Sequence, residues 1–218
     1  MLSDTERREI QQASAAVQRL AALHLQRARS PQSVIAFIGN LHRGVDQVVQ
    51  QAQQAGQALA CESGCSGCCS ARVYASEPEI FQIAATLKTR PSAQFQAVLG
   101  RLQTHAALAA HLSTATHRSP CPLLENHLCS VYAVRPAVCR KAHSLDLAAC
   151  LRPGAAIPQN LNILLQAETL IAGTAAAYQQ TGRAVRGHEL GQAVLLALND
   201  ASLLSRWHAG ETVFPTAG

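Results

Sequence analysis

Residues 61–69 read CESGCSGCC, so that four of the chain's eight cysteines fall in one short stretch. The spacing C-x3-C-x2-C-C turns several sulfur atoms toward one small volume, which is how a chain gathers ligands around a metal ion. Gly64 and Gly67 stand directly before Cys65 and Cys68, where a chain that wraps a metal needs unusual dihedral angles and close backbone approach. The stretch therefore predicts an irregular metal-ligand loop, around which regular elements must be arranged.

The other four cysteines follow downstream, and residues 1–60 and 151–218 contain none. The candidate metal ligands are Cys61, Cys65, Cys68, Cys69, Cys121, Cys129, Cys139 and Cys150. Thiolates are soft anionic donors that bind zinc, iron and iron–sulfur clusters. Eight of them suffice for two four-coordinate sites, or for one cluster with spare cysteines. In an extended chain Cys68 and Cys69 would point to opposite sides, which favours more than one metal unless the backbone turns sharply.

The composition indicates the fold class. Apolar residues make up 48% of the chain and aromatic residues only 4%, and alanine is abundant. This balance favours packed helices over strands, so we expect a mostly all-α protein, a helical bundle with an irregular, loop-rich cysteine-cluster metal site. Hydrophobic periodicity, capping signals, prolines and glycines predict helices over residues 4–28, 32–60, 76–90, 92–113, from 136 onward, 159–181, 187–199 and 201–208.

Three segments follow from this pattern, and we expect them to form one domain. Residues 1–60 form an N-terminal helical hairpin, residues 61–157 form the cysteine-cluster region with an inserted helical hairpin, and residues 158–218 form C-terminal helices on the same core. If the inserted helices fold back on each other, the chain beginning near His117 returns close to Cys69. The two cysteine groups would then share one site.

Charge and hydropathy limit the partners. The net charge is +5, but the basic residues are spread along the chain without a dense run, which argues against nucleic-acid binding. The N-terminus is polar, and no apolar run is long enough for a membrane span, so we expect a soluble, cytoplasmic protein. In that reducing compartment clustered cysteines are ligands or catalysts more often than disulfides. A thiol redox switch with native disulfides is the alternative.

The cysteine pattern resembles that of the YkgJ-like CxxCxxCC cysteine-cluster family. The elements that carry the resemblance are Cys61-x3-Cys65-x2-Cys68-Cys69, Cys121-Pro122-Leu123-Leu124, Cys129-Ser130-Val131-Tyr132, Arg135-Pro136-x2-Cys139-Arg140 and Cys150. The resemblance implies zinc or iron chelation, with the eight cysteines as candidate ligands. A related pattern occurs in flagellin lysine N-methylases with an iron–sulfur cluster, which makes a 4Fe-4S cluster a further candidate. No glycine-rich nucleotide-binding turn follows a strand here, so a methylase is not implied.

Other side chains near the cysteines are candidates for supporting roles. Arg135, Arg140 and Lys141 would offset thiolate charge or hold an anionic substrate, or they form a solvated basic face. His143 or His127 would complete a Cys3His site, although eight cysteines already supply enough ligands.

Three catalytic alternatives are weaker. Residues 188–192 read HELGQ, which opens like a zinc-protease helix, but Gln192 stands where the second histidine ligand is required. Glu125 and Asp146 are candidate proton carriers by location alone, and His105 lies on a helix, where a structural or surface histidine is expected. A nucleophilic cysteine hydrolase does not fit so many cysteines in one place.

We therefore interpret the chain as a metal-binding protein for zinc or iron, with an iron–sulfur cluster as one form that the iron would take. If sulfur fills every coordination position, the protein is a binding module; if one position stays open, it is an iron–sulfur or metal-dependent redox or modifying enzyme. The sequence does not decide whether it is an enzyme. A protein partner or a second copy of the chain on the apolar C-terminal helices is also left open.

Overall fold

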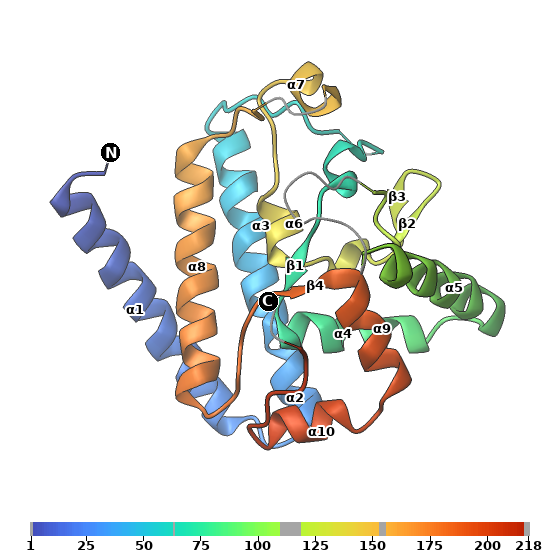
Figure 1. The fold of residues 1–218 in the computed structure, drawn as a ribbon. Coiled ribbons are helices and arrows are strands. Elements are labelled where there is room, and N and C mark those ends of the chain that lie inside the picture. Colours follow the sequence, from blue (N-terminus) through green and yellow to red (C-terminus); the bar gives the residue numbers. More distant parts are fainter. Residues whose placement is uncertain (1, 63, 110–118, 153–155, 216–218) are drawn as a thin grey trace.

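The structure is a computed structural model that describes residues 2–62, 64–109, 119–152 and 156–215 (Figure 1). Helices predominate and the strands are only two residues long, which confirms the mostly all-α prediction. Within the described residues, no helix has the length and apolar character that a membrane crossing requires. The predicted helix end at residue 113 and the predicted loop start at residue 117 lie outside the described residues.

The N-terminal segment contains α1 (Asp4–Arg27), α2 (Pro31–Ala36) and α3 (Ile38–Gln54). The C-terminal helix α8 (Leu161–Gln180) lies between α1 and α3 and packs against both (Figure 1). The predicted N-terminal hairpin thus has a third helix between its arms. The helix predicted over 32–60 is interrupted at Phe37 and ends at Gln54, because Gly56 adopts a positive φ of 91° and closes the helix.

The scaffold on the other side consists of β1 (Tyr74–Ala75), α4 (Glu77–Lys88), α5 (Ser92–Ala109), β4 (His188–Glu189), α9 (Leu190–Asn199) and α10 (Leu203–His208). The predicted capping box at Ser76 starts α4, with the Glu79 carboxylate reaching back to the Ser76 amide. Both α4 and α5 pack against α9. Strand β1 pairs antiparallel with β4, with Tyr74 opposite Glu189.

The cysteine-bearing region is built from short elements. These are η1 (Gly67–Ser70), β2 (Leu124–Glu125), β3 (Leu128–Cys129), η2 (Tyr132–Val134), α6 (Ala137–Lys141) and α7 (Leu147–Leu151). Strands β2 and β3 form a hairpin whose turn residues Asn126 and His127 have φ of 48° and 63°. Left-handed dihedrals at both positions are typical of a tight two-residue hairpin turn.

One hydrophobic core joins the three segments. Trp207 in α10 is fully buried, with its ring centroid 5.5 Å from that of Phe81 and 6.0 Å from that of Tyr178. Its indole N–H donates a 2.7 Å hydrogen bond to the Ala184 carbonyl, and the Tyr178 hydroxyl donates a 2.8 Å bond to the Val34 carbonyl. Because the core draws side chains from every segment, the cysteine region is supported on both sides.

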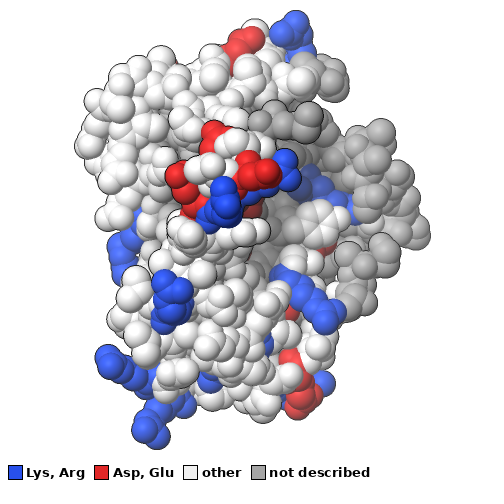
Figure 2. All heavy atoms as spheres, turned by 90° about the vertical axis from the view of Figure 1, so that its left-hand side faces the viewer, with Lys and Arg blue, Asp and Glu red and all other residues white. Residues whose placement is uncertain are grey.

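The charged side chains are distributed over the surface. On the face seen in Figure 2, Lys and Arg side chains lie in several separate groups, one of them mixed with Asp and Glu side chains, and do not form a continuous band. This view agrees with the spread of basic residues along the sequence.

Candidate metal centre

Cys68 and Cys69 lie in the 3-10 turn η1 and not in an extended segment. Because the backbone turns, the two side chains lie close enough to interact, which lowers the pKa of Cys68 to about 6 and raises the pKa of Cys69. The sharp backbone turn that would let both adjacent sulfurs face one site is therefore present.

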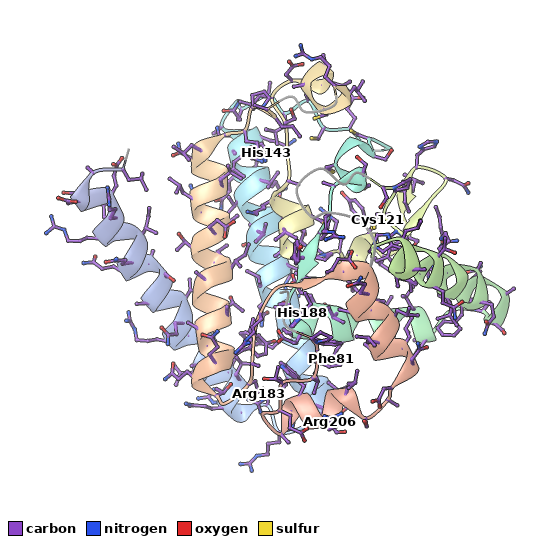
Figure 3. The ribbon with its side chains drawn as sticks, viewed as in Figure 1. Phe81, Cys121, His143, Arg183, His188 and Arg206 are labelled. Atoms are coloured by element: carbon purple, nitrogen blue, oxygen red, sulfur yellow. The ribbon has the colours of Figure 1, made fainter. Side chains whose placement is uncertain are left out.

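The chain returns to this turn after α5, as the sequence predicts. The Ser119 amide donates a 3.1 Å hydrogen bond to the Ser70 carbonyl, and the Cys121 amide donates a 2.7 Å bond to the Cys69 carbonyl. These two bonds bring the first cysteine group beside the second. Figure 3 shows Cys121 close to the β2–β3 hairpin and α5.

Cys129 and Cys139 complete this inner group. Cys129 lies opposite Leu124 in the hairpin, and it packs against the hydrophobic core together with Cys121. Cys139 lies inside α6, for which Pro136 is the N-cap, so the predicted helix start is confirmed within one residue. Burial raises the pKa of Cys139, and the nearby thiols of Cys121, Cys68 and Cys129 raise it further. We call Cys69, Cys121, Cys129 and Cys139 the inner set.

Cys61, Cys65 and Cys150 form an outer set. Cys150, in α7, lies against η1, since a Cβ atom on Gly67 would be 3.4 Å from the Cys150 Cβ. Cys61 and Cys65 are exposed, and the turn between them passes through Gly64, whose φ is 85° as expected for a ligand loop. Burial raises the pKa of Cys61, and the outer thiols and Cys68 raise it further. Cys68 thus lies between the two sets.

All eight cysteines are free thiols. Burial raises the pKa of Cys121 to about 11 and also raises the pKa of Cys129. These thiols are protonated near neutral pH, so a metal ion must displace protons to bind them. As the side chains are placed, no three Cys, His, Asp or Glu residues of the described chain converge on one metal position. The donor type nevertheless fits zinc or iron, for which thiolate is a preferred ligand.

Arginines surround the inner set but have protein partners. Arg135, Arg140 and Arg90 lower the pKa of Cys129 electrostatically, against the larger effect of burial. Arg140 is buried and forms an ion pair with Asp46 of α3, which also contacts Arg135. The guanidinium groups can therefore offset thiolate charge while they hold the backbone in place.

Lys141 and Tyr132, which also lie near the cysteines in the sequence, have local partners. Lys141 forms an ion pair with Glu168 of α8. Tyr132 is 63% exposed and stacks on the Arg135 guanidinium, 3.8 Å from the ring centroid. Of the candidate proton carriers, Glu125 binds Arg90 and Arg101, and Asp146 caps α7 through the Ala148 amide.

The candidate histidines have structural roles. His143 is buried beside the ends of α3 and α8 (Figure 3), where its Nδ1 is 2.7 Å from the Lys141 carbonyl and its Nε2 accepts from the Asn160 amide at 2.8 Å. Both ring nitrogens are thus occupied, so His143 does not serve as a ligand in this arrangement. His127 lies in the hairpin turn.

The HELGQ segment is also structural. The His188 Nε2 lies 2.9 Å from the Glu77 carboxylate, and the Glu189 carboxylate lies 2.9 Å from the His105 Nε2. The sequence gives no signal for these two His–Glu pairs, because their members lie on different elements. The pairs hold β4 and the start of α9 against α4 and α5.

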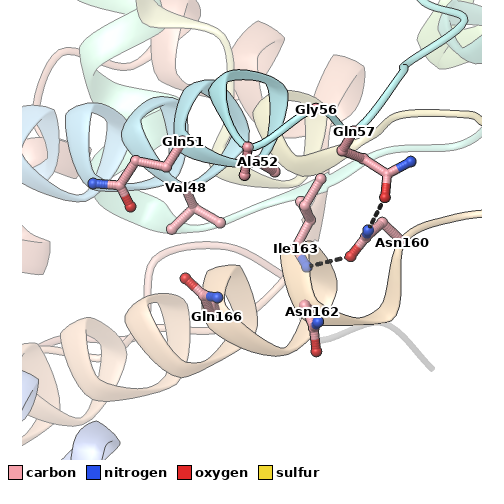
Figure 4. A pocket seen from close by; sticks show the side chains of 10 residues that line it. Val48, Gln51, Ala52, Gly56, Gln57, Asn160, Asn162, Ile163 and Gln166 are labelled. Carbon is pink, nitrogen blue, oxygen red and sulfur yellow. Dashed lines mark hydrogen bonds between the residues drawn. The ribbon is translucent and has the colours of Figure 1, made fainter.

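One cavity has no cysteine among the residues that line it. It measures about 410 Å³ and opens between the end of α3 and the start of α8 (Figure 4). Amide and small apolar side chains line it, and the Asn160 Nδ2 donates a 2.6 Å hydrogen bond to Gln57. Cys121 instead borders a cavity of about 10 Å³ together with His105 and Glu189. That space is about the size of one water molecule.

A comparison with protein-family models identifies the cysteine region. Residues 60–161 match the CxxCxxCC family model. Its description reads "putative zinc- or iron-chelating domain", and the matched range contains all eight cysteines. The match confirms the expected resemblance and supports metal binding by this region. Searches of curated proteins and of solved structures found no match.

Proposed function

We propose that residues 60–161 bind zinc or iron through their cysteines, with the inner set as the principal ligands. The observation that carries this proposal is the 2.7 Å hydrogen bond from the Cys121 amide to the Cys69 carbonyl. It joins two cysteine groups that are separated in the sequence by the helices α4 and α5. Four thiols then lie in one half-buried region, which is the ligand number of a tetrahedral zinc site and of a 4Fe-4S cluster.

Metal binding requires the inner thiols to turn toward one another from their present positions. The elements that carry them are short and irregular, and such elements adjust at lower cost than long helices. The surrounding arginines would compensate the thiolate charge that forms when protons leave. The outer set, with Cys68, supplies further ligands for a second ion or for a larger cluster. We expect the protein to work where thiols remain reduced, as in the cytoplasm.

The decisive experiment is metal and sulfide analysis with an absorption spectrum on anaerobically purified protein. Zinc without colour would select a structural or binding site, whereas iron with sulfide and a brown colour would select a cluster. Apo-protein that takes up neither zinc nor iron would refute the proposal. Cys121→Ser and Cys139→Ser should abolish stoichiometric binding, while Cys61→Ser should retain the inner metal.

A redox or modifying enzyme is the second candidate, and one observation favours it. Cys68 is exposed and lies between the inner and outer sets, and its interaction with Cys69 lowers its pKa, so its sulfur is accessible for an exchangeable coordination position. An enzyme of this kind predicts a metal site that accepts an added small ligand such as cyanide. Unchanged spectra of the iron-loaded protein on adding cyanide would count against it.

A further inference from the structure

Glu79 does more than start its own helix. In a capping box the carboxylate at this position reaches back to the cap residue, and here the Glu79 Oε2 accepts from the Ser76 amide at 2.9 Å and from the Ser76 hydroxyl at 2.6 Å. The other oxygen is not needed for the cap. It points instead toward α3 and α6.

That second oxygen connects two further elements. The Glu79 Oε1 lies 3.2 Å from the His42 Nε2 of α3, and it accepts a 2.7 Å hydrogen bond from the Ala137 amide. Ala137 is the first residue of α6, which has no side-chain cap of its own. The carboxylate from α4 thus satisfies an N–H group that the start of α6 would otherwise leave buried without a partner.

Burial makes this arrangement specific. Glu79 is only 4% exposed and Ala137 only 2%, so water does not replace either partner easily. All four hydrogen-bonding groups around the carboxylate are donors or, in His42, able to donate. Only a side chain with two acceptor oxygens satisfies them together.

We propose that Glu79 is a positioning residue for the metal centre: its carboxylate fixes the start of α6 and thereby the location of the Cys139 sulfur. The inference rests on the proposed metal-binding function and adds a residue outside the cysteine pattern. Cys139 is the third residue of α6, so a shift of the helix start moves its thiol directly. Arg140 and Asp46 hold the same helix on α3 from its other end.

Glu79→Gln tests the proposal, because the amide keeps the size of the side chain but places an NH2 group against N–H donors. The matched control is Glu77→Gln. Glu77 lies on the same helix, is 1% exposed, and likewise pairs with a histidine and accepts from a backbone amide, those of His188 and Arg186. The two residues that contact Glu77 lie in β4 and just before it, and this segment contains no cysteine.

The measurement is anaerobic Co²⁺ titration of full-length apo-protein, followed by competition with Zn²⁺. Glu79→Gln should weaken Co²⁺ binding by about 10- to 100-fold, the usual effect of losing a group that orients a ligand. It should also change the ligand-field bands of bound Co²⁺, which report the arrangement of the thiolates. Glu77→Gln should lower the unfolding midpoint but keep both the affinity and the spectrum of the wild type.

A backbone variant provides an independent test, and it decides the matter if Glu79→Gln does not fold. Ala137→Pro removes the backbone N–H that donates a hydrogen bond to Glu79. Proline is tolerated there because Ala137 is the first residue of the helix and Pro136 before it has non-helical dihedral angles. It should weaken Co²⁺ binding as Glu79→Gln does. The two changes together should cost less than the sum of their separate effects, since they break one contact.

The outcomes separate the two proposals. Failure of the wild type to bind Co²⁺ or Zn²⁺ would overturn the proposed function and this inference with it. Normal binding by the wild type with unchanged affinity and spectrum in folded Glu79→Gln would overturn the inference alone. An equal loss of affinity in Glu77→Gln would also overturn it, because the effect would then reflect general stability.

Discussion

The Asp46 carboxylate on α3 forms an ion pair with the Arg140 guanidinium, which is buried at the end of α6. Arg140 also donates through Nε to the Arg135 carbonyl at 2.9 Å and through Nη2 to the Ala133 carbonyl at 2.5 Å. One planar group thus joins α3, α6 and the chain that precedes α6. The arginine that ends the Arg-Pro-x-x-Cys-Arg element therefore fixes the position of α6, and with it Cys139. This structural role accounts for the arginine without a bound substrate.

Replacing Arg140 by lysine should show that these contacts depend on the planar, forked shape of the guanidinium group. Lysine keeps the charge but does not reach three acceptors in a fixed fork, so at least one buried carbonyl loses its donor. We expect the free energy of unfolding of the apo-protein to fall by about 2 kcal/mol in urea titrations. Lys141→Arg, at the neighbouring exposed ion pair, should leave it nearly unchanged.

Acid should destabilise the protein through Glu79. Burial tends to raise the pKa of this carboxyl, but hydrogen bonds from His42, Ala137 and Ser76 outweigh it and lower the pKa below the ordinary 4.5. Well above pH 4.5 the Glu79 carboxylate is charged in both the folded and the unfolded chain, and its hydrogen bonds stabilise the folded state. As the pH falls below 4.5 the unfolded chain takes up a proton first, so stability decreases.

Urea titrations of the apo-protein between about pH 6 and pH 3 measure this loss, with Glu79→Gln as the control. The variant should be less stable at pH 6 and should lose less stability on acidification. Parallel pH profiles for the two proteins would show that other carboxyls cause the acid sensitivity.

Metal uptake should strengthen as the pH rises. Burial raises the pKa of Cys121 to about 11 and the pKa of Cys129 and Cys139 above the ordinary 9.0, so these thiols release protons when they bind a metal. Between about pH 6 and pH 8 the Zn²⁺ affinity should therefore increase, and calorimetry in buffers of different ionisation enthalpy should detect the released protons. Binding without proton release would exclude these thiols as ligands.

Local signals predicted much of the cysteine region. The glycine before Cys65, the capping box at Ser76 and the proline before α6 each produced the expected backbone, because each acts through neighbouring residues. The return of the chain to Cys69 was also predictable from two helices joined by a short turn.

Long-range relationships were not predictable from spacing. The insertion of α8 between α1 and α3 depends on which helix faces fit together, and the second contact of Glu79 depends on a residue far along the chain. The β2–β3 hairpin was missed because Asn126-His127 is a weaker turn signal than a pair containing glycine. The sequence patterns therefore point to the candidate ligands, but they miss most of the contacts that hold the cysteine region in place.

Two helix glycines should respond oppositely to alanine. A Cβ on Gly173 of α8 would lie 2.6 Å from the Ser14 carbonyl oxygen and 2.7 Å from the Val17 Cβ, so α1 and α8 pack closely only because no side chain intervenes. Gly173→Ala should destabilise the protein by about 1–3 kcal/mol. Gly100 of α5 has open space around it, and Gly100→Ala should stabilise it by about 0.5–1 kcal/mol. Thermal unfolding of both variants measures the difference.

The three sequence segments should unfold together. Trp207 is the single tryptophan, and it packs between Phe81 of the central segment and Tyr178 of the C-terminal segment, whose hydroxyl binds Val34 of the N-terminal segment. Its fluorescence therefore reports the contact of all three, whereas far-ultraviolet circular dichroism reports the helices throughout the chain. We propose one cooperative domain, for which the two signals should follow a single urea transition in the apo-protein. A fluorescence change well before the loss of helical signal would mean instead that the C-terminal helices separate from a core that stays folded, and that the segments are independent units.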